Sequence, residues 1–287
     1  MEALWRGFTE DKAGKAVLAT MVHTWKALGP RFGPIRGDMV TIADCRAHTK
    51  ARREAGIKDG TIHTELGHLR MVLLWAADHK LIATAPRIER PSKPEPKERW
   101  LTRSEVKKLI DAAEKPHMKL VMHLLLATAG RVAAVLELTW DRVDFKTRQI
   151  RLRNPDDPTK RKGRAVVPIN ATLMAVLTEA KEGAMSPYVV EWGGHPIKSI
   201  KKGMRLAAAR AKLDGVTPHV FRHTAAVWMV ESGIPMEEVA QFLGHSNPGI
   251  TRRVYARFSP DYLQTASSAL ELDEPSDVDP TPEMEET

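Results

Sequence analysis

The sequence predicts a mainly helical protein of two domains: a helical bundle, then a mixed α/β, mostly helical domain with a small β-hairpin. In "APRIERPSKPEPKERW", prolines at 86, 91, 94 and 96 interrupt any helical pattern. Closely spaced prolines favour an extended connection between domains. Strand signals are scarce before this segment, and one β-rich region lies among helical patterns after it. A chain of 287 residues is long enough to bury two separate cores.

These features predict a helical domain over residues 1–85, a linker over 86–99, a second domain over 100–268 and a tail over 269–287. In the first domain, one helical stripe carries Ile62, Leu66, Leu69, Leu73 and Ala76, the spacing of a core-facing helix. The tail has eight carboxylates and no Lys or Arg from residue 271 onward. It has almost nothing to bury, so we expect it to be disordered.

The second domain is expected to open with a capped helix, because Thr102 and Glu105 have capping-box spacing. The segments "RQIRLR" and "RAVVPI" have β-branched, alternating character, and "NPDDPTKRKG" between them carries turn residues. They predict a β-hairpin. A helix over residues 171–181, a short strand at "YVVEW" and further helices to about residue 268 complete the expected order.

The charge of the chain points to a polyanionic partner. Without the acidic tail, 44 basic residues stand against 28 acidic ones, a net charge of +16 over residues 1–270. Nucleic acid is the simplest such partner, although Lys and Arg could equally solvate helix faces. The single cysteine, Cys45, argues against disulfides and Cys-based zinc sites and fits a reducing cytoplasm. No apolar run approaches the roughly 18 residues of a membrane span, and no secretion signal is evident.

The stretch "TPHVFRHT" has the features of a phosphate site. Thr217 suits the N-cap and Pro218 the first helical position, which places His219 and Arg222 in the first turn on one face. Free backbone N–H groups, a guanidinium fork and an imidazole together suit a phosphate.

Zinc binding is the alternative for the same stretch. The zinc-protease motif needs Glu next to the first His of an H-x-x-x-H pair, and Val220 stands there. We therefore interpret His223 as a packing or supporting residue and expect no metal.

The following segment, "ESGIPMEEVAQFLGH", has a helix–turn–helix pattern, which alone would indicate DNA binding without chemistry. It is followed by "RRVYARF", where Tyr255 comes directly after a basic segment. A groove-reading domain has no need of a tyrosine there, so we interpret Tyr255 as a nucleophile of the phosphate site.

These motifs resemble the tyrosine recombinases of the phage integrase family. The family's H-x-x-R-H-T is found at His219–Thr224, its L-G-H at Leu243–His245, and its nucleophile position at Tyr255. The first arginine motif matches "TAGRVAAVLELTWDRVDF", which makes Arg131 the first arginine. The hairpin lysine matches Lys160 in "TKRKGRAVVP", with Lys162 as the alternative. The resemblance covers roughly residues 1–265, and residues 1–85 resemble the family's helical core-binding domain.

The resemblance implies a catalytic set of six residues: Arg131, Lys160, His219, Arg222, His245 and Tyr255. Tyr255 would attack a DNA phosphodiester and form a 3′-phosphotyrosyl bond, without metal, ATP or another cofactor. The arginines would hold the phosphate oxygens, and Lys160 would protonate the leaving 5′-oxygen. His219 would accept or orient the tyrosine proton, and His245 would donate a hydrogen bond to the phosphate.

The sequence departs from the family pattern at two points. Ala134 stands where an acidic residue is usual, three positions after the first arginine. The interval from His245 to Tyr255 is ten residues, one longer than in many members. Neither departure removes a residue of the catalytic set.

The resemblance also implies partners and a site of action. These are double-stranded DNA attachment sites, a homotetramer on paired sites, accessory DNA-bending or directionality factors, and no membrane. The expected function is integration or excision of a phage or other mobile element in the bacterial cytoplasm. A Xer-like dimer-resolving recombinase and a non-catalytic DNA-binding regulator stay open as alternatives.

Several further residues are candidates for contacts with DNA or with another protomer. The candidate DNA contacts are Arg46, Lys50, Arg52, Arg53 and Lys162. The segment "SPDYLQTASSALEL" could pack on its own domain or on a neighbouring protomer. Because the bundle begins almost at Met1, we expect either a simple integrase without an arm-binding domain or a shortened chain.

Overall fold

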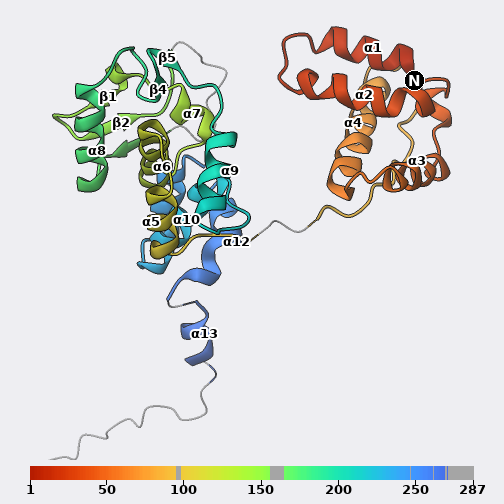
Figure 1. Cartoon of the computed structure of the whole chain (residues 1–287). Coiled ribbons are helices and arrows are strands. Elements are labelled where there is room, and N and C mark those ends of the chain that lie inside the picture. Colours follow the sequence, from red (N-terminus) through yellow and green to blue (C-terminus); the bar gives the residue numbers. More distant parts are fainter. Residues whose placement is uncertain (95–97, 156–164, 246, 261, 269, 271–287) are drawn as a thin grey trace, which may run out of the picture. The chain divides into compact units, whose positions relative to one another are not determined.

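The computed structural model describes residues 1–94, 98–155, 165–245, 247–260, 262–268 and 270. The chain divides into two compact units, Met1–Lys97 and Glu98–Thr287. Each unit has a hydrophobic core of its own. The predicted disordered tail, apart from Leu270, lies outside the described residues (Figure 1).

The first unit is a bundle of four helices. They are α1 (Glu2–Asp11), α2 (Val17–Phe32), α3 (Ile42–Glu54) and α4 (Asp59–Asp78), with a 3-10 turn at Gly37–Met39. The predicted stripe of α4 is confirmed, because Ile62, Leu66, Leu69, Leu73 and Ala76 are all fully buried. They pack against α1, α2 and α3. The bundle therefore forms because α4 is apolar along one face, as its sequence predicts.

The predicted linker, residues 86–99, is partly packed at both ends. Ile88 is buried in the core of the first unit, and His63 is hydrogen-bonded through its ring to the carbonyl of Pro91. At the other end, the Arg99 guanidinium pairs with Glu105 at 2.7 Å in the second unit. Described residues at both ends of the predicted linker therefore have partners in the unit next to them.

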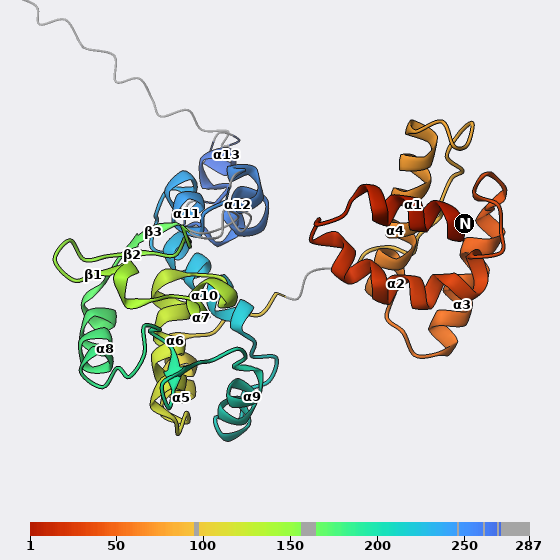
Figure 2. The same cartoon turned by 90° about the horizontal axis from the view of Figure 1, so that it is seen from above.

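The second unit is mostly helical (Figures 1 and 2). Its helices are α5 (Arg103–Asp111), α6 (Pro116–Thr128), α7 (Val132–Leu136), α8 (Ala171–Glu182), α9 (Lys201–Arg210), α10 (Pro218–Glu231), α11 (Met236–Leu243), α12 (Pro248–Tyr255) and α13 (Gln264–Ser268). Two 3-10 turns, η2 (Trp140–Arg142) and η3 (Ala256–Phe258), interrupt them. The capping box between Thr102 and Glu105 is confirmed at the start of α5. α6 packs against α5, α7, α8 and α10.

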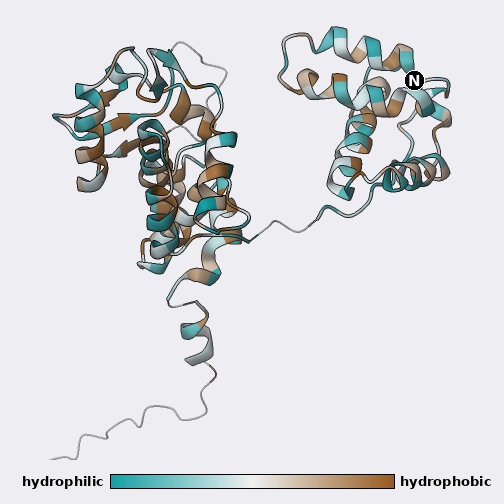
Figure 3. Ribbon diagram, in the orientation of Figure 1, coloured by the Kyte–Doolittle hydropathy of each residue, from teal (hydrophilic) through white to brown (hydrophobic). Residues whose placement is uncertain are grey.

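A small antiparallel sheet of three strands covers part of this core. Its strands are β1 (Val143–Asp144), β2 (Gln149–Arg151) and β3 (Val166–Pro168). The predicted hairpin is confirmed, because Ile150 pairs with Val167 in antiparallel register and both are fully buried. Figure 3 shows hydrophobic residues on these strands and along α6.

The strand expected at "YVVEW" is shorter than the sequence predicts. Only β4 (Glu191–Trp192) forms, paired with β5 (His195–Pro196), while Tyr188 makes a single bridge to Thr139. Val189 and Val190 are buried in the core, which explains why they have the apolar character of a strand without belonging to one.

Candidate active site

Arg222 lies at the centre of the candidate site. It is 4% exposed and projects from the first turns of α10. Its guanidinium donates from Nη1 to the carbonyl of Ala129 and from Nη2 to the carbonyl of Leu243, both at 2.8 Å. Burying a charged group without partners is costly, so these two hydrogen bonds are what makes a buried arginine tolerable here.

Both acceptors of Arg222 lie at helix C-termini. Ala129 is the C-cap of α6 in the left-handed conformation, and Leu243 is the last residue of α11 before the left-handed cap Gly244. Carbonyls at a helix C-terminus lack intrahelical partners and carry partial negative charge. Two helix ends therefore hold the cation. Burial, and then the charge of Arg131, lowers the pKa of Arg222 to about 10, so it stays charged at neutral pH.

His245 holds the same guanidinium from another side. Its Nε2 lies 2.9 Å from Nη2 of Arg222, and its Nδ1 lies 2.8 Å from Oγ1 of Thr251. A guanidinium only donates hydrogen bonds, so Nε2 accepts, and Nδ1 carries the proton and donates to Thr251. Burial, then the charges of Arg222 and Arg131, lowers the pKa of His245. In this arrangement both ring nitrogens of His245 contact protein groups, and the ring orients Arg222. The predicted hydrogen bond from His245 to a phosphate stays a prediction.

Tyr255, the last residue of α12, is 7% exposed. Its ring belongs to a small hydrophobic cluster with Ala225, Ala226 and Val239, and α12 packs against α10 and α11 (Figure 2). Burial raises the pKa of the phenol, and the positive charge of Arg222 acts in the opposite direction. The phenol is therefore protonated at neutral pH and lies within the field of the buried arginine.

The partner of the Tyr255 hydroxyl is His223, whose Nδ1 lies 3.1 Å away. We expected His219 in this role and interpreted His223 as a packing residue. The sequence did contain a signal for His223: it lies one helical turn after His219, at i and i+4, and therefore shares a face with the predicted phosphate residues.

His219 and Arg131 belong to the more open part of the site. Arg131 is the exposed N-cap of α7, and His219 is more exposed than Arg222. Partial burial, then the charges of Arg222 and Arg131, lowers the pKa of His219. Arg131 lowers the pKa of His219, Arg222 and His245 alike, which brings two arginines and two histidines into one electrostatic group.

The remaining predictions for this unit concern Lys160, Lys162 and Ala134. Lys160 and Lys162 lie in residues 156–164, outside the described part of the chain. Ala134 is 1% exposed and packs in the main core. A carboxylate at this buried position would need a partner, and the methyl group needs none.

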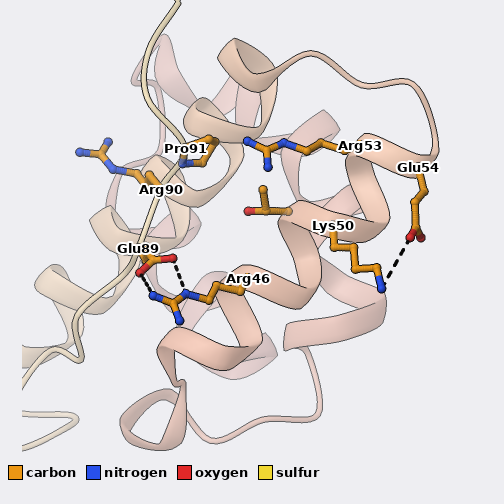
Figure 4. A pocket seen from close by; sticks show the side chains of 8 residues that line it. Arg46, Lys50, Arg53, Glu54, Glu89, Arg90 and Pro91 are labelled. Carbon is orange, nitrogen blue, oxygen red and sulfur yellow. Dashed lines mark hydrogen bonds and ion pairs between the residues drawn. The ribbon is translucent and has the colours of Figure 1, made fainter.

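In the first unit, three of the four candidate DNA contacts share a pocket of about 340 Å³. Arg46, Lys50 and Arg53 line it together with Arg90 (Figure 4). Arg46 forms a bidentate pair with Glu89, and Lys50 lies 4.0 Å from Glu54. These are exposed pairs, whose net stabilisation is small.

Arg52 is separate from this pocket and has a structural partner. Its guanidinium makes two hydrogen bonds to Glu65, which is 6% exposed at its side chain. Glu65 also lies 3.0 Å from Nε2 of the buried His48. Arg52 therefore links α3 to α4 through Glu65. It was predicted as a candidate contact with DNA, and in the structure its guanidinium is paired within the bundle.

In the parts of the chain that the structure describes, no cluster of His, Cys, Asp and Glu could hold a metal ion. None of the described helices combines the length and the apolar character needed to cross a membrane.

The second unit thus brings arginine, histidine and tyrosine side chains into one group within a mostly helical fold. Residues 99–261 match the phage integrase family. The chain therefore belongs to that family, the tyrosine recombinases. The integrase of Salmonella phage P22 is 27% identical over 241 residues, which cover 76% of this chain and 60% of that protein. Tyrosine recombinase XerA of Pyrococcus horikoshii is 28% identical over 199 residues, covering 67% of this chain and 68% of that protein.

Solved structures share the fold. An integrase of the Tn1549 transposon in complex with a circular intermediate DNA has a TM-score of 0.78 at 19% identity, covering 94% of this chain and 98% of that chain. A lambda integrase dimer bound to a core site has a TM-score of 0.72 at 17% identity, covering 87% of this chain and 96% of that chain. At these identities, the likeness concerns the fold.

Proposed function

We propose that the protein is a site-specific DNA recombinase of the integrase type, which cleaves and rejoins DNA through a 3′-phosphotyrosyl intermediate. The observation that carries this proposal is the grouping of Arg222, His245 and Tyr255, which come from α10, the turn after α11, and α12. Arg222 is hydrogen-bonded to His245, and its charge acts on the phenol of Tyr255. Arginine is suited to phosphate because its planar fork can reach two oxygens. A tyrosine in the field of such a group has the chemistry of a nucleophile toward phosphorus.

In the proposed reaction, Oη of Tyr255 gives its proton to a neighbouring histidine and attacks the phosphorus, and the bond from phosphorus to the 5′-oxygen breaks. Arg222 and Arg131 stabilise the charge that develops on the non-bridging oxygens, an effect typically worth roughly 100- to 1000-fold per donor. His245 keeps the Arg222 fork in place, and His219 faces the phosphate from the start of α10. Lys160 donates a proton to the departing 5′-oxygen. The products are a phosphotyrosyl bond and a free 5′-hydroxyl.

The same bond makes the reaction reversible without ATP or metal. A 5′-hydroxyl from a second DNA site attacks the phosphotyrosyl bond, releases Tyr255 and joins the strands. Four strands are cut in a full exchange, so four protomers meet on two sites. A chain of a lambda integrase tetramer bound to a Holliday junction has a similar fold, with a TM-score of 0.68. This similarity supports the assembly of four protomers on two sites. Double-stranded attachment sites, accessory factors and action in the bacterial cytoplasm belong to the same proposal.

Integration or excision of a mobile element is the leading biological role, since the P22 relative is an integrase. Dimer resolution of the Xer type is the second candidate, because XerA proteins match over two thirds of this chain. The chain spans 60% of the length of the P22 integrase, so the target sites and partners of the full reaction are part of the proposal.

The test is covalent capture of DNA. A duplex selected for binding from a random-sequence pool is nicked near the cleavage point, so that the cut strand diffuses away, and adducts are resolved in SDS. The wild-type protein should form an SDS-stable adduct, Tyr255→Phe should bind the same duplex without forming it, and Tyr262→Phe should behave as wild type. Tyr262 is the matched control because it is 47% exposed and lies beyond η3. An adduct formed by Tyr255→Phe would contradict the proposal.

A further inference from the structure

His223 occupies a position that the proposed reaction has not yet used. Its Nδ1 lies 3.1 Å from the Tyr255 hydroxyl, the reacting atom, and the two ring centroids lie 5.1 Å apart. Its other nitrogen, Nε2, is buried and has no hydrogen-bond partner among the described residues. The imidazole is therefore held with one nitrogen on the nucleophile and the other in an apolar place.

Two aromatic rings lie beside the half-buried imidazole of His223. The ring of Trp100 lies edge-on at 6.5 Å and that of Phe258 at the same distance. The charged or titratable groups that act on the imidazole are His219 on α10, Arg257 on η3 and Glu98 before α5. Burial, followed by His219 and Arg257, lowers the pKa of His223, and Glu98 opposes them. The imidazole is therefore neutral at pH 7.

The charge states leave two possible directions for the hydrogen bond. A neutral imidazole has one N–H and one accepting nitrogen, and the phenol of Tyr255 is protonated because burial raises its pKa. If the phenol donates, Nδ1 accepts and the proton of His223 is on Nε2. The opposite direction would leave the phenol proton unpaired in place of the Nε2 proton. A phenol is the stronger hydrogen-bond donor and an imidazole nitrogen the stronger acceptor, so donation from Tyr255 to Nδ1 is the more favourable arrangement.

We propose that His223 is a catalytic residue that accepts the phenol proton at Nδ1 as Tyr255 attacks the phosphorus. This inference rests on the proposed function. As the bond from Oη to phosphorus forms, the O–H bond breaks and its proton moves to Nδ1, while the 5′-oxygen leaves with a proton from Lys160. In the reverse step the imidazolium returns its proton to Oη. His219, which we expected in this role, has no hydrogen bond to Tyr255 among the contacts that the structure describes.

One arm of the test needs no DNA. Nitrogen-15 NMR of the histidine-labelled free protein at pH 7 reports the tautomer, with the His223 signals assigned by their loss in His223→Asn. We expect the proton on Nε2, and a shift of the Nδ1 signal in Tyr255→Phe, which removes the donor. A proton on Nδ1 in the wild-type protein would overturn the proposal, whether or not the protein cleaves DNA.

The second arm measures the rate of covalent attachment at pH 7 on the nicked duplex. His223→Ala should attach at least about 100-fold more slowly, within the usual range for loss of a general base, with unchanged DNA affinity. Added imidazole should restore part of the rate. A duplex with sulfur in place of the scissile 5′-oxygen should not restore the rate of His223→Ala. The thiolate leaves without needing a proton, but the variant still lacks the base that takes the phenol proton.

His223→Asn separates proton transfer from positioning. The Asn side chain can keep an accepting oxygen near the place of Nδ1 but cannot take up a proton at neutral pH. It should therefore fold, bind DNA and remain as slow as the Ala variant, while His195→Ala, a change of an exposed histidine in the same unit, should have no effect. Wild-type rates in either His223 variant would overturn the proposal. A wild-type protein that forms no adduct at all would instead refute the proposed function, and the NMR arm would still decide the hydrogen bond.

Discussion

At the scale of single residues, Arg222 shows why lysine cannot stand in for arginine. Its two terminal nitrogens join the ends of α6 and α11 and also meet His245. A lysine ammonium is a point charge on a flexible stem and cannot span these acceptors. The position of the charge, and with it the electrostatic group of the site, depends on the planar fork.

Arg222→Lys should therefore lower the rate of covalent attachment by at least about 100-fold, the usual loss for one charge-stabilising donor. DNA affinity should change by no more than a few fold, since the charge remains. Single-turnover attachment and equilibrium binding, measured on the same duplex, check both. Arg252→Lys is the control, because Arg252 is an exposed residue paired with Glu237 on the surface. Near-normal attachment by Arg222→Lys would mean that the fork is not used in the reaction.

Histidines that are wholly or partly buried also give a pH dependence of stability. Burial is the first cause of a lowered pKa in each of seven: His48, His68, His117, His123, His219, His223 and His245. Each group binds its proton more readily in the unfolded chain, so stability is fully present above the unfolded pKa of about 6.5 and is lost as pH falls below it.

Chemical denaturation between pH 7.5 and 5.5 should show this loss as a falling free energy of unfolding. The window lies above the normal range of carboxylate pKa values, about 4, so the change belongs to the histidines. A free energy of unfolding that is constant or rises over this range would contradict the assignment of neutral, buried imidazoles.

At the scale of elements, the sequence predicted what local periodicity can specify. The apolar stripe of α4 follows from the helical period of about 3.6 residues. The cap of α5 follows from capping-box spacing, and the β2–β3 hairpin follows from the alternation of its side chains. The strands β1, β4 and β5 have two residues each, too few to show any period. The contact of His223 with Tyr255 spans 32 positions and depends on how α12 docks on α10, which no local pattern contains.

Among the residues that the structure describes, several apolar side chains around α13 are exposed. Tyr262, Leu263 and Leu270 are 47%, 61% and 81% exposed. Of the two alternatives for this segment, packing on its own domain and docking on another protomer, the exposure favours the second. Docking between protomers would couple one active site to the next.

Truncation after Ser259 should therefore leave binding to a single site unchanged and abolish strand exchange between two sites. Gel-shift and recombination assays on the selected duplex measure the two properties. Truncation after Leu270, which removes only the acidic tail, serves as the control and should recombine normally. Normal recombination by the shorter chain would refute docking through this segment.

At the scale of the whole molecule, the chain consists of two units with separate cores. Residues 1–270 together carry a net charge of +16. The first unit contributes the pocket of Arg46, Lys50, Arg53 and Arg90, and the second contributes the candidate active site. We propose that both units contact one duplex, as a clamp. The phosphate contacts of the two units would then add up in the salt dependence of binding.

A fragment from Glu98 onward should fold, because the second unit has its own core, but should bind DNA more weakly. The slope of affinity against salt concentration should also be shallower, since each lost phosphate contact removes roughly 0.9 from the slope. Fluorescence anisotropy titrations at several salt concentrations give both quantities. A fragment with the affinity and slope of the full chain would contradict the clamp.

The identity of the linkage between protein and DNA tests the central claim most directly. The SDS-stable adduct is digested with trypsin and nuclease and analysed by mass spectrometry. Arg253 and Arg257 flank Tyr255, whereas Tyr262 falls in the next peptide. We predict a nucleotide joined through its 3′-phosphate to the peptide Val254–Arg257, and a free 5′-hydroxyl on the released strand. A nucleotide on the peptide that contains Tyr262, or a linkage through a 5′-phosphate, would contradict the assignment of Tyr255 as the nucleophile.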